Sequence, residues 1–488
     1  MLFNSLEYLI FYPIITILYF ILPYKARWIL LLAGSYYFYM AWKPVYIVLM
    51  LATTTVAYIT GLKMGNIKQK EKRKKYLYLS LIVNLGLLIT FKYFNFFNDS
   101  AKLIANNLGV QYNIPNLNVL LPMGISFYTF QTLSYSIDVY RGSIKPEKHF
   151  GIFALYISFF PQLVAGPIER AQSLLPQFYN ENKFDYDRIT KGLKIMMGGF
   201  FKKVVVADRL GVAVNTIYNA PAKHNGIQFI IATIFFAFQI FYDFSGYSDI
   251  AIGSAKVMGF NLMKNFERPY FSKTITEFWR RWHISLSSWF KDYLYIPLGG
   301  NRVSKYRNYF NLFLTFLISG LWHGANWTFV IWGALHGVLL VIEKAISPLK
   351  KRFENFMGID KRSLIYKAVR VFITFSIVTF SWIFFRANTL NDAIYIITHL
   401  FSDVGKLTNY QFMATSISSM GLTKFNLIIA ILGIISIETV HLLERKRDIC
   451  EWISNMPLLL RWSIYTVLST ATFWLAFSEM KQFIYFQF

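Results

Sequence analysis

Apolar runs separated by short polar or basic stretches dominate the pattern of this chain. Many of these runs approach or exceed the roughly 18 residues that a helix needs to cross a bilayer. The pattern therefore predicts an all-α polytopic membrane protein with about 11–12 transmembrane helices, plus re-entrant and interfacial helices. The expected spans lie near residues 6–22, 28–40, 44–62, 76–97, 119–140, 192–218, 227–245, 308–322, 326–343, 368–386, 425–443 and 462–478.

The stretch 150–170 fits a simple span poorly. It is apolar but carries Pro161, Gly166 and Pro167. Non-helical backbone at membrane depth survives only where it is buried in protein or lines a cavity. The stretch is therefore either a re-entrant or broken helix or a proline-kinked span, and the pattern leaves both open.

The stretch 272–300 also departs from a simple span. Thr274 and Glu277 match the capping box that starts helices. Beyond them, apolar and polar side chains recur on two separate stripes at helical spacing, and Thr276, Arg280, His283, Ser287 and Lys291 form the polar stripe. This pattern predicts one amphipathic helix over 272–293 that lies in the membrane interface with its basic face towards water.

Composition supports a membrane protein and excludes an ordinary soluble one. Hydrophobic residues make up 55% of the 488 residues and charged residues 15%, against about 25% charged in soluble proteins. The single cysteine, Cys450, rules out an intramolecular disulfide framework and a cysteine-based metal site. We interpret residues 6–22 as a retained span rather than a removed signal peptide, because the basic residues follow the apolar run.

The net charge of +25 is explained by membrane topology rather than by nucleic-acid binding. Basic residues cluster in loops between apolar runs, and the positive-inside rule places such loops in the cytoplasm. We expect the loops 63–75, 344–367 and 444–461 inside, and the segment 387–424 and the C-terminus outside.

Among seven histidines, only His323 and His336 lie deep in strongly apolar stretches. On one straight helix they would point about 140° apart, so we do not expect them to pair, and no metal-ligand spacing appears. A lone intramembrane histidine is either a hydrogen-bonded packing residue or a base, since imidazole titrates near neutrality. His283, beside Arg280 and Arg281, suits a wet, cationic mouth that could meet phosphates, or it is an ordinary residue at the water line.

Two carboxylates, Asp243 and Asp249, lie among small residues in the stretch 241–260. Small residues favour close helix packing. The carboxylates could line a polar cavity or cap a broken helix, and a structural role is the simpler interpretation.

Several stretches together resemble the membrane-bound O-acyltransferase family, and most closely its bacterial alginate and peptidoglycan O-acetyltransferase branch. They are "TEFWRRWHISLSSWFKDYLYIPLGGNR", "LISGLWHGANWTFVIWGALHG", "LPMGISFYTFQTLSYSIDVYRG", "FPQLVAGPIER", "FYDFSGYSDIAIG", "FSWIFFRA" and the C-terminal "FIYFQF". The resemblance implies a single membrane domain over 1–488 with a core near 119–343. It also implies a funnel on each face, meeting at the catalytic histidine His323, with His283 as the second active-site position.

The function implied is transfer of an acetyl group from a cytoplasmic donor, acetyl-CoA, across the bacterial cytoplasmic membrane to a cell-surface polysaccharide. We expect His323 to act as the base, Arg280 and Arg281 to bind the donor, no permanently bound cofactor and no metal. A D-alanyl transferase acting on teichoic acid with a carrier-protein donor is the alternative within the family. A polysaccharide transporter without chemistry is the alternative outside it.

The aromatic tail 481–488 has two interpretations. It could be an interfacial anchor. It also resembles the F-x-Y-x-x-F motif of the small peptide that partners the D-alanyl branch. On that resemblance, Tyr485 accepts the acetyl group and passes it to an extracytoplasmic serine esterase-like (SGNH-type) partner.

Overall fold

The computed structural model describes residues 1–164, 166–477, 483 and 484, and every regular element within them is helical. This confirms the predicted all-α class. The chain divides into two compact units, one of residues 1–193 with 250–263 and one of residues 194–249 with 264–488. Two helices, α10 (Tyr186–Phe200) and α12 (Gly226–Val257), pass from one unit into the other.

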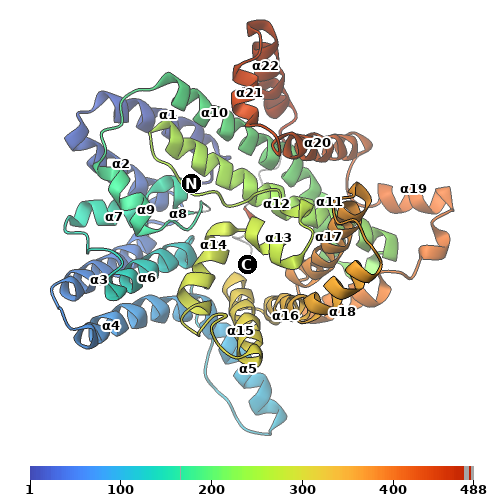
Figure 1. Ribbon diagram of the computed structural model, residues 1–488, viewed down its shortest axis with the longest axis horizontal. Helices are drawn as coiled ribbons and strands as arrows, with labels where there is room; N and C mark the ends of the chain where they lie inside the picture. Colours follow the sequence, from blue (N-terminus) through green and yellow to red (C-terminus); the bar gives the residue numbers. More distant parts are fainter. Residues whose placement is uncertain (165, 478–482, 485–488) are drawn as a thin grey trace. The chain divides into compact units, whose positions relative to one another are not determined.

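The first unit holds the N-terminal helices. In Figure 1, α6 lies beside α3 and α4, and α7 packs against α2. The helices are α1 (Leu6–Ile21), α2 (Tyr24–Met40), α3 (Ile47–Gly65), α4 (Lys70–Leu88), α5 (Phe94–Asn107), α6 (Ile125–Arg141), α7 (Phe150–Ser158), α8 (Phe160–Leu163) and α9 (Ala171–Leu174).

The stretch 150–170 is a broken helix, which was one of its two predicted alternatives. The helix α7 ends at Ser158, Phe159 leaves the helical conformation (φ −50°, ψ 110°), and α8 restarts with Pro161 in its first turn. A proline is tolerated there because the first helical N–H groups have no intrahelical acceptor. Most of this stretch is buried, as irregular backbone in a membrane protein requires.

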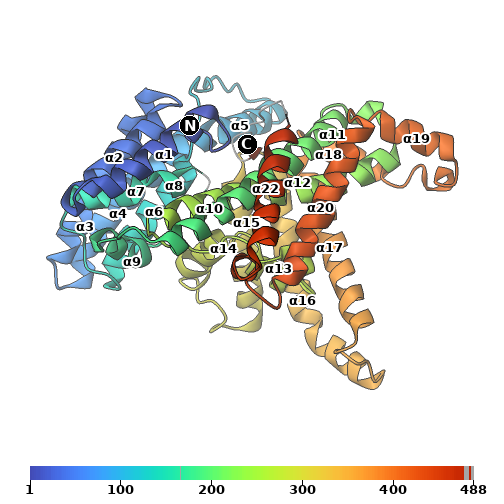
Figure 2. The same cartoon turned by 90° about the horizontal axis from the view of Figure 1, so that it is seen from above.

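The second unit is built around two antiparallel neighbours, α15 and α16, with α17 beside α16 (Figure 2). A π-helical segment (Phe201–Ala207) joins α10 to α11. The helices of this unit after α10, besides α12, are α11 (Asp208–Tyr218), α13 (Ile275–Arg281), α14 (Ile284–Phe290), α15 (Lys305–His323), α16 (Trp327–Phe356), α17 (Leu364–Arg386), α18 (Leu390–His399), α19 (Tyr410–Ser418), α20 (Lys424–Leu443), α21 (Ile449–Ser454) and α22 (Leu458–Trp474).

The prediction of one amphipathic helix over 272–293 is wrong. The helix starts as predicted, with the Thr274 hydroxyl accepting a hydrogen bond from the Glu277 N–H (3.0 Å). However, α13 ends at Arg281, and α14 begins only after His283, whose backbone is left-handed (φ 44°). That residue changes the helix direction, so the stripes read from one continuous helix do not continue across it.

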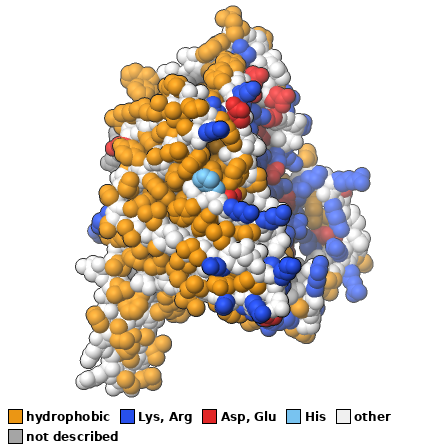
Figure 3. Space-filling view, turned by 90° about the vertical axis from the view of Figure 1, so that its left-hand side faces the viewer, with side chains coloured by type: hydrophobic (Ala, Val, Ile, Leu, Met, Phe, Trp, Pro, Cys, Tyr) orange, Lys and Arg blue, Asp and Glu red, His pale blue; other side chains and the backbone are white. Residues whose placement is uncertain are grey.

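Six helices among the described residues are long and apolar enough to span a membrane. They cover residues 44–65, 70–107, 226–257, 327–356, 364–386 and 424–443. Several other expected spans coincide with helices that are shorter or more polar, such as α1 with 16 residues. Hydrophobic side chains cover much of the nearer surface in Figure 3, as expected for a surface that meets lipid.

Candidate active site

His323 is held at the turn of a tight helical hairpin. It is the last residue of α15, and Gly324 follows it in an extended conformation. The Asn326 side chain then caps α16 by accepting a main-chain N–H bond (3.0 Å). Gly320 and Gly333 face each other where the two helices touch, which brings their backbones close. The sequence therefore places this imidazole on a rigid element, and the structure buries it.

His283 lies at the break between α13 and α14. Left-handed backbone is rare for residues other than glycine and costs free energy that the surrounding structure must offset. The side chain is fully buried, so the prediction of a wet, cationic mouth around His283 is wrong. The left-handed backbone takes the imidazole off the polar stripe and into the protein interior.

Asn265 determines which nitrogen of His283 carries the proton. Its side-chain oxygen accepts hydrogen bonds from the Ser285 N–H (3.3 Å) and hydroxyl (2.9 Å), and it lies 2.9 Å from His283 Nδ1. Because an amide oxygen only accepts, Nδ1 must donate, and the lone pair of the neutral ring is on Nε2. Burial lowers the pKa of His283 to about 3, which keeps the ring neutral near pH 7.

The two histidines lie together in an aromatic cluster. Their ring centroids are 6.5 Å apart, near enough for both rings to serve one reacting centre. Trp322 lies beside both rings, 6.2 Å from His283 and 5.0 Å from His323. Phe244 packs edge-on against His283 at 4.6 Å, and Trp332 packs edge-on against His323 at 5.1 Å. Apolar rings on several sides would limit the access of water to chemistry here.

His336 has a structural role. Its Nδ1 accepts a hydrogen bond from the Trp279 indole N–H (3.2 Å), and its Nε2 lies 2.9 Å from the Ser381 hydroxyl. An indole nitrogen only donates, so Nε2 of the neutral ring carries the proton. His336 thus ties α13 and α17 to α16, which matches the packing interpretation of a buried histidine.

Comparison with known proteins places this site in a family. The profile of the membrane-bound O-acyltransferase family matches residues 147–385. The probable alginate O-acetylase AlgI of Pseudomonas syringae pv. tomato is 42% identical over 80% of this chain and 74% of its own length. The peptidoglycan O-acetyltransferase of Helicobacter pylori is 36% identical over 79% of this chain and 77% of its own length. The chain belongs to the membrane-bound O-acyltransferase family.

A third relative, the teichoic acid D-alanyltransferase of Streptococcus thermophilus, is 31% identical over 55% of this chain and 69% of its own length. Membership makes the protein a multi-pass membrane acyltransferase. The matched region starts later than the predicted core of 119–343 and extends further, and it contains both His283 and His323.

The two arginines implied for the acyl donor have different surroundings. Arg280 is exposed on α13, and no ion pair to it is found among the described residues. Arg281 is half-buried, and its guanidinium donates to the Glu277 carboxylate (2.6 Å). Glu343 from α16 accepts the Ile275 N–H (2.7 Å) at the start of the same helix. Arg280 is therefore more accessible than Arg281 to a negatively charged acyl donor.

The predicted tail residue Tyr485 lies outside the described residues. The two described residues just before it, Phe483 and Ile484, are buried, with exposures of 0% and 2%. An exposed interfacial anchor would leave such side chains accessible. The described part of the tail is therefore packed into the second unit.

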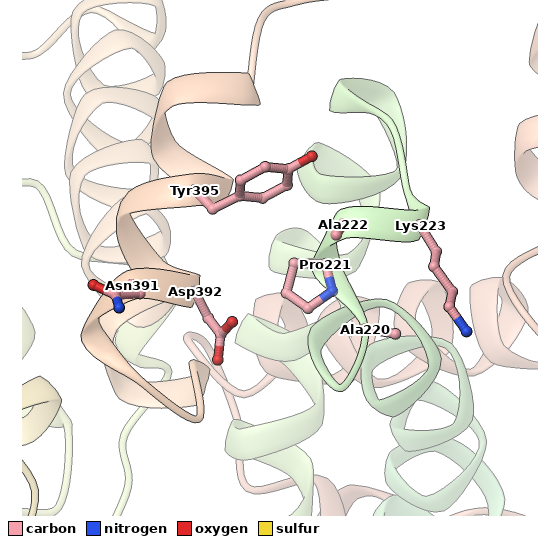
Figure 4. A pocket seen from close by; sticks show the side chains of 7 residues that line it. All are labelled: Ala220, Pro221, Ala222, Lys223, Asn391, Asp392 and Tyr395. Atoms are coloured by element: carbon pink, nitrogen blue, oxygen red, sulfur yellow. The ribbon is translucent and has the colours of Figure 1, made fainter.

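A shallow cleft of about 370 Å³ lies elsewhere in the second unit (Figure 4). It is formed by the turn after α11 and by α18, and its lining includes Lys223, Asp392 and Tyr395. Asp392 caps the start of α18, which gives it a structural role. None of the predicted site residues lines this cleft.

Asn265 is a site residue that the sequence did not reveal. It stands in an irregular loop, 18 positions before His283, and carries no periodic or motif signal. The only local indication of the site at His283 was its place in the R-W-H-I-S motif. The hydrogen bond between the two residues depends on how the loop folds back onto α14.

Proposed function

We propose that this protein transfers an acetyl group from acetyl-CoA, on the cytoplasmic side of the bacterial cytoplasmic membrane, for O-acetylation of a cell-surface polysaccharide. The observation that carries this proposal is the pair of buried histidine rings, 6.5 Å apart, on a helical hairpin and a helix start. Relatives named for alginate and peptidoglycan O-acetylation support the substrate class.

In the proposed reaction His323 is the general base. Its imidazole takes the proton of an acceptor hydroxyl while the oxygen bonds to the carbonyl carbon of the thioester. The carbon–sulfur bond then breaks, and the departing thiolate takes the proton from the imidazolium. A positioned base contributes about 10²- to 10⁴-fold. The neutral His283, held by Asn265, presents Nε2 as a hydrogen-bond acceptor that would help to orient the hydroxyl.

We propose that the first acceptor is the phenol of Tyr485. The acetyl ester formed there is then attacked by a serine hydroxyl of an extracytoplasmic SGNH-type partner, and the phenolate regains a proton. This divides transfer across the membrane into two steps. A D-alanyl transferase is the second candidate, supported by the relative at 31% identity. The aromatic motif on this chain itself favours acetyl transfer, because that branch takes its motif from a separate peptide.

The test uses purified protein in liposomes with labelled acetyl-CoA, the SGNH-type partner and a polysaccharide acceptor. His323→Ala should lower acetyl transfer at least 100-fold while the protein remains folded, because the general-base contribution is lost. His399→Ala, an exposed histidine on α18, is the matched control and should retain wild-type turnover. A folded His323→Ala protein with more than about a tenth of wild-type turnover contradicts the proposal.

Tyr485→Phe tests the relay separately, since it removes only the hydroxyl. Acetylation of the surface polymer at the wild-type rate in that variant would show that the Tyr485 hydroxyl carries no acetyl group and that the relay is wrong. Glycan transport without any His323-dependent thioester cleavage would instead favour the transporter alternative.

A further inference from the structure

A buried ion cluster lies in the second unit. The Lys203 ammonium is 2.9 Å from an oxygen of Asp208 and 2.7 Å from Oδ1 of Asp243. All three side chains are at most 4% exposed. They come from the π-helical segment, α11 and α12. One ammonium between two carboxylates satisfies the charge of Lys203 and leaves Asp243 a second oxygen for another donor.

That second oxygen holds the C-terminal segment. Oδ2 of Asp243 accepts a hydrogen bond from the Ile484 main-chain N–H at 2.8 Å, across 241 positions of sequence. A carboxylate bond to an N–H group is stronger than a neutral one. Because the donor is main chain, this bond does not depend on the side chain at position 484.

The residue before it packs against the wall of the histidine cluster. The Phe483 ring lies 4.5 Å from Tyr247 and 5.5 Å from Phe244. Phe244 in turn contacts His283. Further upstream, the Phe477 N–H donates to the Val204 carbonyl of the π-helical segment (2.9 Å). The described tail residues therefore contact the same unit that carries both histidines.

We propose that Asp243 is a positioning residue: its carboxylate, aligned by Lys203, anchors the C-terminal segment at Ile484 while Phe483 packs on the aromatic wall of the histidine cluster, so that acetyl transfer depends on this carboxylate. The catalytic consequence rests on the proposed function, whereas the anchoring itself does not. The described end of the chain is then held by one charged hydrogen bond at Ile484 and by the buried ring of Phe483.

The anchoring is tested by chemical accessibility of the tail. Cys450→Ser removes the single native cysteine, and Ile484→Cys places a small thiol at the buried position while keeping its main-chain N–H. The rate of maleimide modification is measured on the full-length protein in detergent. Asp243→Ala is compared with Asp208→Ala, which also removes one carboxylate from Lys203 but no bond to the tail.

We expect Asp243→Ala to raise the modification rate at least tenfold and Asp208→Ala to change it less than threefold. Asp243→Asn keeps an acceptor oxygen and should restore most of the protection. Thermal unfolding shows whether each variant is folded. If Asp243→Ala is not folded, the modification rate of Asp243→Asn alone tests the proposal, and a rate equal to that of the wild type is the expected result. Equal rates in the two Ala variants, or wild-type protection in Asp243→Ala, overturn the proposal.

The protein that carries Cys450→Ser and Ile484→Cys also distinguishes a failure of this inference from a failure of the proposed function. His323→Ala and Tyr485→Phe should leave the modification rate of the thiol introduced by Ile484→Cys unchanged. If Asp243 controls protection but Tyr485→Phe acetylates normally, the anchor stands and the relay is wrong. If protection is independent of Asp243 while His323 remains essential, the anchor is wrong and the acyltransferase proposal stands.

Discussion

The contact between α15 and α16 allows a quantitative prediction about the position of His323. A methyl group added at Gly320 would lie 2.3 Å from the Phe329 carbonyl oxygen and 2.9 Å from Gly333 Cα. Both are main-chain atoms, so no side-chain rotation can relieve the clash. Ordinary contact starts at 3.4 Å, so the two helices must separate by about 1 Å.

The expected cost of Gly320→Ala follows from two opposing terms. Overpacking of a close contact destabilises by about 1–3 kcal/mol, towards the upper end here because backbone faces backbone. Alanine in place of glycine within a helix recovers up to about 1 kcal/mol. The net loss is about 2 kcal/mol, which lowers the apparent unfolding midpoint by a few degrees. Because His323 follows one turn later, a shift of about 1 Å should also lower turnover by about 100-fold.

The assay is thermal unfolding of the detergent-solubilised protein, combined with acetyl transfer from labelled acetyl-CoA. Gly198→Ala in α10 is the matched control, since a methyl group there meets no atom within 4 Å. That variant should be as stable as the wild type or slightly more stable. If Gly320→Ala unfolds at the wild-type temperature and turns over normally, these glycines do not set the hairpin spacing and the reasoning is refuted.

Two further predictions concern α13 and the break that follows it. Arg280→Ala should raise the KM for acetyl-CoA several-fold, and by more at low salt. Arg281→Ala should have a smaller effect on KM, because the Arg281 guanidinium is paired with Glu277. Unchanged KM values in both variants would show that neither arginine binds the acyl donor. Burial lowers the pKa of His283 to about 3, against about 6.5 for an ordinary histidine, so the unfolded chain binds an extra proton between these values and stability is lost as the pH falls below 6.5. At pH 5 this loss is about 2 kcal/mol. In His283→Asn, whose side chain tolerates left-handed backbone, the unfolding temperature should differ less between pH 7 and pH 5 than it does in the wild type. An equal pH dependence of the two proteins contradicts this role of His283.

Local sequence signals were sufficient for the class of the protein and for several helix ends. Apolar runs and a low charge content imply helices in a membrane, because unpaired backbone groups are too costly in lipid. The start of α13 at Thr274 was predictable because a cap is a contact between near neighbours. The break in 150–170 was predictable as an alternative, because proline and glycine act on their own backbone. The resemblance singled out His283 and His323, whose roles remain proposals.

The tertiary structure decided what depends on residues far apart in the chain. Periodicity assumes an unbroken helix, so it placed His283 on a wet face; the left-handed backbone at that residue buries it instead. The bond from Asn265 and the distance from His283 to His323 follow from how separate helices pack. The bond from Asp243 to Ile484 joins segments 241 positions apart, which no local pattern encodes. Such contacts form only when the whole unit is packed, because the distance between two remote residues depends on the backbone conformation of every residue between them and on how the helices pack.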